Sequence, residues 1–242
     1  MVKKILTERG CEILAAELRE QILSGDYSSG EMLPNERDLA ELSGLSRGSV
    51  REAMLILETQ GLISTTVGRN QGRRAIAPSN RVVRDSINIF IRGRRVPFLA
   101  LMETFETFAP AVCALAATNR DDNDIISLSE CQENLKVTLG AKRFVQANFE
   151  WHAAIGRASH NPLLGAIYES LGPNMVDPHV AGFTSKEVRA KARYAVDRIH
   201  EAILAQDPEL ARRRMLSHVQ AYRSMIEPLA PRTVSLKANE AG

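Results

Sequence analysis

The sequence predicts a mainly α protein, with a small helical domain that ends in a β-ribbon and a larger antiparallel α-helical bundle after it. Two observations carry this prediction. Residues 7–78 alternate short helical patterns with glycine turns and end in two strand-like stretches, whereas only amphipathic helical patterns occur from residue 96 onward. A chain of 242 residues with 44% hydrophobic content is long enough to build both parts.

The N-terminal part begins with three helices. Apolar residues recur at helical spacing over residues 7–24, and Gly25 supplies a stop. Asn35 is a suitable N-cap for a short second helix, ERDLAELS, which Gly44 breaks. Ser46 can cap the third helix, which runs to about Gln60. Two short helices joined by a tight turn that contains glycine form a helix-turn-helix.

The first turn of the third helix carries two arginines and two small residues. Arg47 and Arg51 are one helical turn apart and therefore project from one face, while Gly48 and Ser49 keep that face low. The second helix of a helix-turn-helix enters the major groove with its N-terminal residues, and arginine can bind guanine O6 and N7 together. We therefore predict sequence-specific DNA binding here, although two arginines at this spacing are by themselves usually a solvated face.

Two β segments, LISTTV and RRAIAP, follow the third helix and are joined by the glycine-bearing tip GRNQG. Arg69, Arg73 and Arg74 lie in this ribbon, where a wing would reach a neighbouring DNA backbone or minor groove. The turn, the capping serine, the preceding helix and the basic ribbon agree with one another, which favours DNA binding over a solvated surface.

Composition narrows the setting. The net charge is only +2, so affinity for nucleic acid has to come from a local patch. The three cysteines are far apart, without a CxxC pair, and the N-terminal residues do not resemble a signal peptide, which predicts free thiols and a cytoplasmic protein. The apolar runs are shorter than a membrane span, so we expect no membrane association.

The remaining chain divides into three parts. Residues 79–95 form a basic, partly helical linker, which is either a solvated connector or an additional phosphate contact. Residues 96–230 contain six amphipathic helical segments, and Pro110 would kink or divide the first of them unless packing tolerates the proline. They predict a bundle whose core is the place for a small-molecule site and for dimerisation. Residues 231–242 read as a loose tail.

The stretch LPNERDLAELSGLSRGSVREAMLILETQGLI resembles the GntR-type winged helix-turn-helix, with a match from about residue 7 to 78. The resemblance implies that Arg37, Arg47 and Arg51, with the small residues between them, contact operator DNA. It also implies that the wing tip, from Gly68 to Gly72, contacts the minor groove. The wing differs from the usual GxGTFV, because this chain has GRNQGRRAI.

The stretches FVQANFEWHAAIGRASHNPLL and ILAQDPELARRRMLSHV resemble the all-helical, FCD-type ligand-binding domain of the FadR subgroup of GntR regulators, over about residues 97–226. Many members hold a divalent metal with one Asp and three His residues, beside a carboxylate effector. Carried over to this chain, the Asp falls on Asn148 and the three His positions on His152, Val196 and His218. An arginine often found near the start of the domain falls on Phe105.

These departures change the expected chemistry. Asn148 is a poorer ligand for a hard cation than a carboxylate, and Val196 is no ligand at all. We therefore expect no metal cofactor, and an effector held by hydrogen bonds from Asn148, His152, His200 and His218 beside Phe105 and Val196. The alternative is a metal-dependent sensor of a small carboxylate or sugar acid, in which His200, one turn beyond Val196, joins His152 and His218 around zinc, nickel or manganese.

The predicted function is a DNA-binding transcription regulator, a repressor of a metabolic operon that a small-molecule effector controls. One recognition helix covers too few base pairs for useful specificity, so we expect a homodimer on operator DNA with an inverted repeat. An enzyme with a DNA-binding domain is the alternative, but no Ser/His/Asp pattern, P-loop or HExxH motif occurs. A DNA-bending structural protein would leave the large helical domain without a role.

Overall fold

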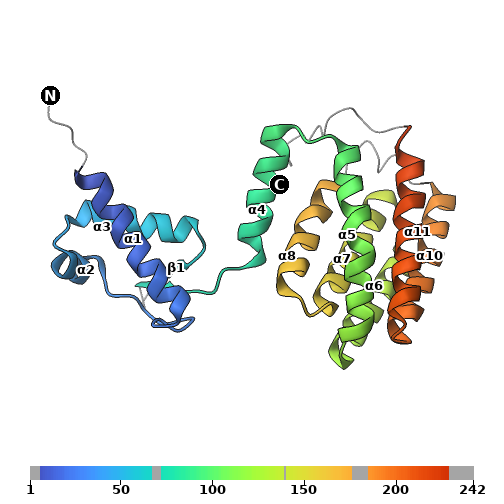
Figure 1. Ribbon diagram of the computed structural model, residues 1–242, viewed down its shortest axis with the longest axis horizontal. Coiled ribbons are helices and arrows are strands. Elements are labelled where there is room, and N and C mark those ends of the chain that lie inside the picture. Colours follow the sequence, from blue (N-terminus) through green and yellow to red (C-terminus); the bar gives the residue numbers. More distant parts are fainter. Residues whose placement is uncertain (1–5, 67–71, 139, 176–184, 229–242) are drawn as a thin grey trace. The chain divides into compact units, whose positions relative to one another are not determined.

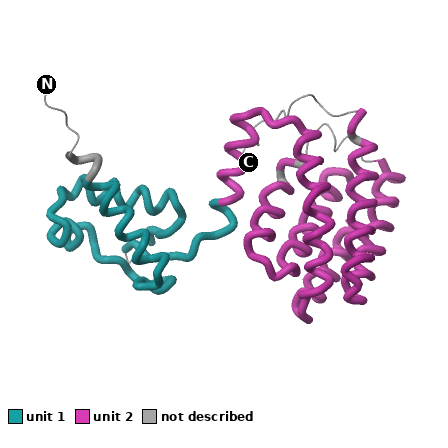
Figure 2. Tube along the Cα trace, in the orientation of Figure 1, with its two compact units in different colours: residues 1–82 teal, residues 83–242 magenta. Residues whose placement is uncertain are grey.

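A computed structural model describes residues 6–66, 72–138, 140–175 and 185–228. The chain divides into two compact units, Met1–Val82 and Val83–Gly242 (Figure 2). Each unit has its own cluster of buried apolar side chains, so each can be described by itself.

The first unit contains three helices and a two-stranded antiparallel ribbon. In the ribbon, Ile63 pairs with Ala75 and Thr66 with Gly72. The elements are α1 (Leu6–Ser24), α2 (Glu36–Ser43), α3 (Arg47–Thr59), β1 (Ile63–Thr66) and β2 (Gly72–Ala75).

Capping residues set the boundaries of the helix-turn-helix. The Asn35 side chain accepts hydrogen bonds from the backbone N–H groups of Arg37 and Asp38 at the start of α2. Gly44 ends α2 at a φ of 69°, a left-handed conformation that glycine adopts at little cost. Ser46 caps α3, because its Oγ accepts a hydrogen bond from Ser49 N. These predicted caps and turns are confirmed.

The interior face of α3 forms the core of the first unit. Val50, Ala53, Met54 and Leu57 are almost completely buried, and α3 packs mainly on α1. Burying these four side chains fixes the rotation of α3 about its axis. As a result, the N-terminal residues Arg47 and Gly48 remain exposed.

The second unit is an all-helical bundle in the described part of the chain. Its six main helices are those that the sequence predicts, and the mainly α fold class is confirmed. The elements are α4 (Asn80–Arg94), α5 (Phe98–Asn119), α6 (Asp122–Val137), α7 (Ala141–Ala158), α8 (Pro162–Leu171), the short turn η1 (Gly172–Met175), α10 (Lys186–Leu204) and α11 (Pro208–Ile226) (Figure 1).

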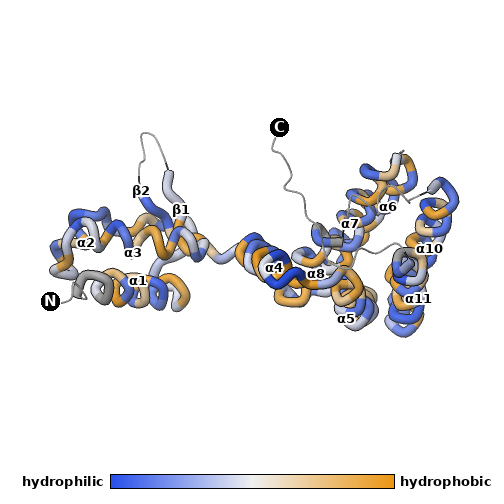
Figure 3. The backbone as a smooth tube through the Cα atoms, turned by 90° about the horizontal axis from the view of Figure 1, so that it is seen from above, coloured by the Kyte–Doolittle hydropathy of each residue, from blue (hydrophilic) through white to orange (hydrophobic). Residues whose placement is uncertain are grey.

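The stretch expected to be a linker forms a continuous helix, α4, and Ile91 of that helix is buried in the bundle core. Figure 3 shows hydrophilic and hydrophobic residues alternating along α4 and the bundle helices, as helices with one buried face require. The predicted tail at 231–242 lies outside the described residues.

Helix α5 is the central helix of the bundle. Pro110 is buried inside it, and the helix is continuous from Phe98 to Asn119, so the packing tolerates this proline without dividing the helix. Among the described helices, α5 alone is long and apolar enough to cross a membrane by length and composition, and 50% of that stretch is buried inside the bundle. Its buried side chains instead pack against α11 and α7.

Two glycines let α7 and α8 approach each other closely. A Cβ atom added to Gly165 of α8 would lie 3.2 Å from the carbonyl oxygen of Gly156 of α7. A Cβ added to Gly156 would lie 3.4 Å from the Tyr168 side chain. This close packing brings Tyr168 to the centre of the bundle, where it meets His152.

Candidate functional site

Two of the arginines predicted to contact DNA are exposed and held weakly or not at all. Arg47, at the first position of α3, is exposed and makes no side-chain interaction with the described part of the chain. The side chain of Arg37 is 68% exposed and lies 3.5 Å from Glu41 one turn away. A Cβ added to Gly48 would find only Ser46 Oγ within 4 Å, at 3.7 Å, so this position is open.

Arg51 is held by an acidic residue to which the sequence analysis assigned no role. Its guanidinium donates to the Glu36 carboxylate, at 3.1 Å from Nη2, and Arg73 Nη1 donates to the same carboxylate at 2.8 Å. The hydrogen bond from Arg51, followed by that from Arg73, holds the pKa of Glu36 below its ordinary value. Glu36 therefore joins α2, α3 and the ribbon, and it fixes where Arg51 points.

Two of the three ribbon arginines make contacts within the first unit, and the third lies outside the described residues. Arg73 has a side chain only 17% exposed, and Arg74 donates to the Gly30 carbonyl at 2.8 Å, so both are used within the unit. Gly72 packs against the terminal methyl group of Met32, which would have to move to admit a Cβ there. Arg69 lies outside the described residues.

Ser49 is not part of the exposed face. It is 4% exposed, and its Oγ lies 3.0 Å from Ser46 Oγ inside the cap of α3. The sequence placed it beside Gly48 on a low surface, but the burial of the neighbouring Val50 turns Ser49 inward. Its small size serves the cap.

The second unit contains a small cavity of about 60 Å³ in the middle of the bundle. Four of the predicted pocket residues, Phe105, Asn148, His152 and His218, line it from three helices. The rest of the lining is apolar or aromatic, and no described lining residue is an acid, a lysine or an arginine. It consists of Met102, Phe144, Val145, Phe149, Val188, Ala192, Val219 and Tyr222.

The two histidines of the cavity are neutral at physiological pH. Burial, followed by the neighbouring His218, holds the pKa of His152 well below its ordinary value. Burial alone lowers the pKa of His218 to about 4. Their rings stack at a centroid distance of 5.7 Å, and two adjacent positive charges would repel there.

A hydrogen bond orients His152, whereas the side-chain oxygen of Asn148 has no hydrogen-bond partner in the described part of the chain. His152 Nδ1 lies 2.9 Å from the hydroxyl oxygen of Tyr168, whose pKa burial raises well above its ordinary value. Asn148 Oδ1 is buried without a hydrogen-bond partner in the described part of the chain. A buried carbonyl oxygen that lacks a donor costs free energy, and a ligand N–H or O–H would relieve that cost.

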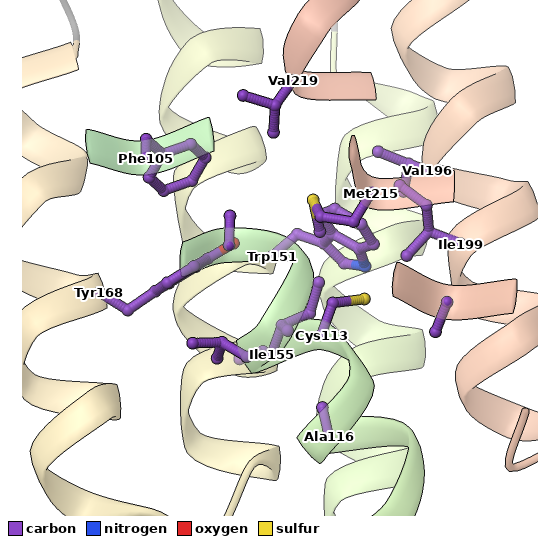
Figure 4. Close-up of a cluster of buried hydrophobic side chains, with 14 of the residues drawn as sticks. Phe105, Cys113, Ala116, Trp151, Ile155, Tyr168, Val196, Ile199, Met215 and Val219 are labelled. Carbon is purple, nitrogen blue, oxygen red and sulfur yellow. The ribbon is translucent and has the colours of Figure 1, made fainter. Parts of the chain in front are cut away.

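The structure does not bring Val196 and His200 to this cavity. Val196 lies with Met215 and Ile199, away from Phe105 and Tyr168 (Figure 4). His200 is buried against α6, where its Nε2 lies 3.3 Å from Ser129 Oγ. The expectation that both residues line the pocket is corrected by this rotation of α10.

The donors of the cavity do not fit a tightly bound divalent metal. They are two neutral imidazoles and one amide oxygen, and no lining carboxylate compensates the charge of an ion. In the described residues, Asp121, Asp124 and His160 are the only three His, Cys, Asp or Glu side chains with ligand atoms within 4.8 Å of one another. These residues lie elsewhere, at the N-terminal cap of α6.

Sequence reasoning missed two residues that organise the two sites. Glu36 could have been found, because an acid directly precedes Arg37 in the helix-turn-helix pattern. Tyr168 gave no local signal, since it reaches His152 from another helix. Phe144, Phe149 and Tyr222, which line the cavity, read in the sequence only as apolar positions of amphipathic helices.

The first unit has a helix-turn-helix with an exposed start of α3 and a β-ribbon, and the second is a helical bundle with a cavity. This combination is that of a DNA-binding transcription regulator with an effector-binding domain. Residues 12–71 match the bacterial regulatory proteins of the gntR family, and residues 100–221 match the FCD domain. The chain belongs to the GntR family and carries an FCD domain.

Relatives and a solved structure agree with this family. The Glc operon transcriptional activator of Escherichia coli is 27% identical over 231 residues, which cover 90% of this chain and 89% of that protein. The HTH-type transcriptional repressor NanR of Citrobacter rodentium is 28% identical over 223 residues, covering 87% and 82%. A structure described as Streptococcus agalactiae GntR matches in fold with a TM-score of 0.65 at 22% identity, over 88% of this chain and 99% of that one.

Replacing Arg47 tests base recognition. Arg47→Ala should weaken binding to specific operator DNA by about 1–3 kcal/mol, because a bidentate hydrogen bond to guanine is lost. The same substitution should weaken binding to random duplex DNA much less. Fluorescence anisotropy with both DNAs measures the difference. Arg212→Ala, an exposed arginine on α11, is the matched control and should change neither affinity. Equal loss on both DNAs would refute base recognition by Arg47.

The cavity histidines should make stability depend on pH. The folded pKa of His218, about 4, lies below the ordinary 6.5, so the unfolded chain binds more protons between these values. This contribution is complete above about pH 6.5 and is lost as pH falls toward 4. The free energy of unfolding, measured by urea denaturation between pH 6.5 and pH 4, should fall less steeply with decreasing pH for His218→Gln than for the native sequence.

The surface residue His160 provides a control of opposite sign. Its hydrogen bond to Asp124 raises the pKa of His160, so its contribution is present at low pH and is lost as pH rises through the folded value. His160→Gln should therefore reduce stability mainly at acid pH. If the free energy of unfolding falls equally with pH in His218→Gln and in the native sequence, a neutral, buried His218 is contradicted.

Proposed function

We propose that this protein belongs to the FadR subgroup and acts in the cytoplasm as a repressor of a metabolic operon that a small molecule relieves. The observation that carries the proposal is the unpartnered Asn148 Oδ1 in a cavity of the effector-binding domain. A hydrogen-bond donor on a bound ligand would satisfy this buried oxygen. One relative is described as a transcriptional repressor, which supports repression by this protein. Another is described as a transcriptional activator, so activation is the alternative that an experiment has to test.

The effector is held by hydrogen bonds and not by a metal ion in this proposal. Asn148 accepts a donor from the ligand, and His152, oriented by Tyr168, supplies a second polar contact. Phe105 covers one side of the cavity, with its ring 5.3 Å from that of His152. His200 takes no part, because it faces Ser129.

Ligand binding has to change the bundle, because the cavity is too small for a metabolite. Its volume of about 60 Å³ lies well below the roughly 300–1,000 Å³ of ordinary ligand pockets. An effector that enters must widen the space between the helices that line it, and it stabilises the wider state by its differential affinity. Such a change in the bundle is the signal that alters DNA binding.

We further propose a homodimer that places two copies of α3 on an inverted repeat. One DNA-binding unit, with Arg37 on α2 and Arg47 and Arg51 on α3, reads only a few base pairs, whereas two copies related by a twofold axis multiply the specificity. The symmetry of the protein would then set the spacing of the half-sites.

Selection of binding sites from random duplex DNA tests the proposed function without knowledge of the effector. The full chain should enrich an inverted repeat, and sedimentation on the enriched DNA should give two chains per duplex, because each half-site receives one α3. Carrying Arg47→Ala through the same selection should abolish the enrichment. A monomer on a single half-site, or no enriched sequence, would contradict the proposal.

A further inference from the structure

A second, larger hollow lies between α10 and α11. Its volume is about 650 Å³, within the range of ordinary ligand pockets. The two helices lie side by side (Figure 1), and short side chains such as Ala195, Ser217 and Ala221 leave the space between them open. We call this hollow the α10–α11 groove.

The α10–α11 groove is cationic. Among the described residues that line it there are four basic side chains and no acid: Lys191, Arg198, Arg213 and Arg214. Arg198 and Arg214 both lie near Glu201, at 2.8 Å and 3.6 Å. Lys191 and Arg213 form no ion pair with the described part of the chain. Two positive charges are therefore left to bind an anion.

The groove and the inner cavity share a wall. Val188, Ala192, His218 and Tyr222 line both of them. A molecule in the groove therefore needs only to displace these side chains to extend a small group toward Asn148. The chemistry changes across the wall, because the groove is cationic and the cavity is uncharged.

This change of chemistry determines which end of a ligand fits each side. A carboxylate in the cavity would be buried beside neutral imidazoles without a compensating charge, which disfavours its binding there. The same carboxylate in the groove lies near Lys191 or Arg213. A neutral hydroxyl or amide, by contrast, suits Asn148 Oδ1 inside the cavity.

We propose that the α10–α11 groove is a binding site for the anionic part of the effector, an organic acid larger than the inner cavity. Its body and its carboxylate or phosphate occupy the groove, and a small neutral group with a hydrogen-bond donor enters the cavity. This inference rests on the proposed function for its biological meaning, but the binding site itself can be tested separately.

Two fluorescent probes of similar shape test the groove with the full chain. Anilinonaphthalene sulfonate is an anion, and phenylnaphthylamine is its neutral counterpart without the sulfonate. The native protein should bind the anion on the order of tenfold more tightly than the neutral probe, because only the anion can pair with the two free cations. Displacement of the bound anion by phenylacetate or by phenyl phosphate then distinguishes a carboxylate ligand from a phosphate ligand.

Charge-removing variants locate the site. The double variant Lys191→Gln with Arg213→Gln should weaken binding of the anionic probe on the order of tenfold and leave the neutral probe unchanged. Arg213→Lys should retain most of the affinity. The control is Arg212→Gln, which removes the neighbouring arginine outside the groove and should have no effect.

Three results would overturn the inference. The first is equal binding of the two probes, or no binding of either. The second is the same loss in Arg212→Gln as in the double variant. The third is a change of oligomeric state in the double variant, measured by sedimentation, which would assign the groove to contact between two copies of the chain.

Operator binding, measured in parallel, separates this inference from the proposed function. If the anionic probe binds as expected but no ligand in the groove changes affinity for selected operator DNA, the groove stands and effector control fails. If operator affinity responds to a metabolite equally in the native chain and in the double variant, effector control stands and the groove assignment fails.

Discussion

A charge cannot enter the interior of this bundle without compensation, and this constraint governs what the effector domain can recognise. His152 and His218 stay neutral because burial lowers the pKa of both, and the described lining contains no carboxylate, lysine or arginine to balance an ion. The same constraint disfavours a divalent metal and assigns neutral donors to Asn148. It leaves the α10–α11 groove, with Lys191 and Arg213, as the place where an anion can be bound.

The DNA-binding unit places its charges at the surface instead. Glu36 binds Arg51 and Arg73 together, so one of these arginines is oriented on α3 and the other ties the ribbon to α2. Arg47 and Arg37 are left exposed, and we propose that they contact the phosphates and bases of DNA. A chain with a net charge of only +2 depends on such locally exposed arginines for any affinity to a polyanion.

The sequence predicted the elements well because their signals are local. The caps Asn35 and Ser46, the turn at Gly44 and the helical periodicity of the bundle depend on residues a few positions apart. The family resemblance further grouped Phe105, Asn148, His152 and His218, which line one cavity. Ser49, Arg73 and His200 were misplaced because their orientation depends on tertiary packing. The rotation of α3 and α10 and the distant partner Glu36 decide where these side chains point, and helical spacing alone carries no such information.

The most direct test of an uncharged effector cavity is native mass spectrometry of the full chain purified without a histidine tag and without added metal. The account predicts a chain free of zinc, nickel and manganese, with any retained molecule an organic acid that also carries a neutral hydrogen-bond donor. Asn148→Asp, which restores a carboxylate beside His152 and His218, should gain affinity for zinc. One equivalent of metal per native chain, lost in His152→Ala, would contradict the account.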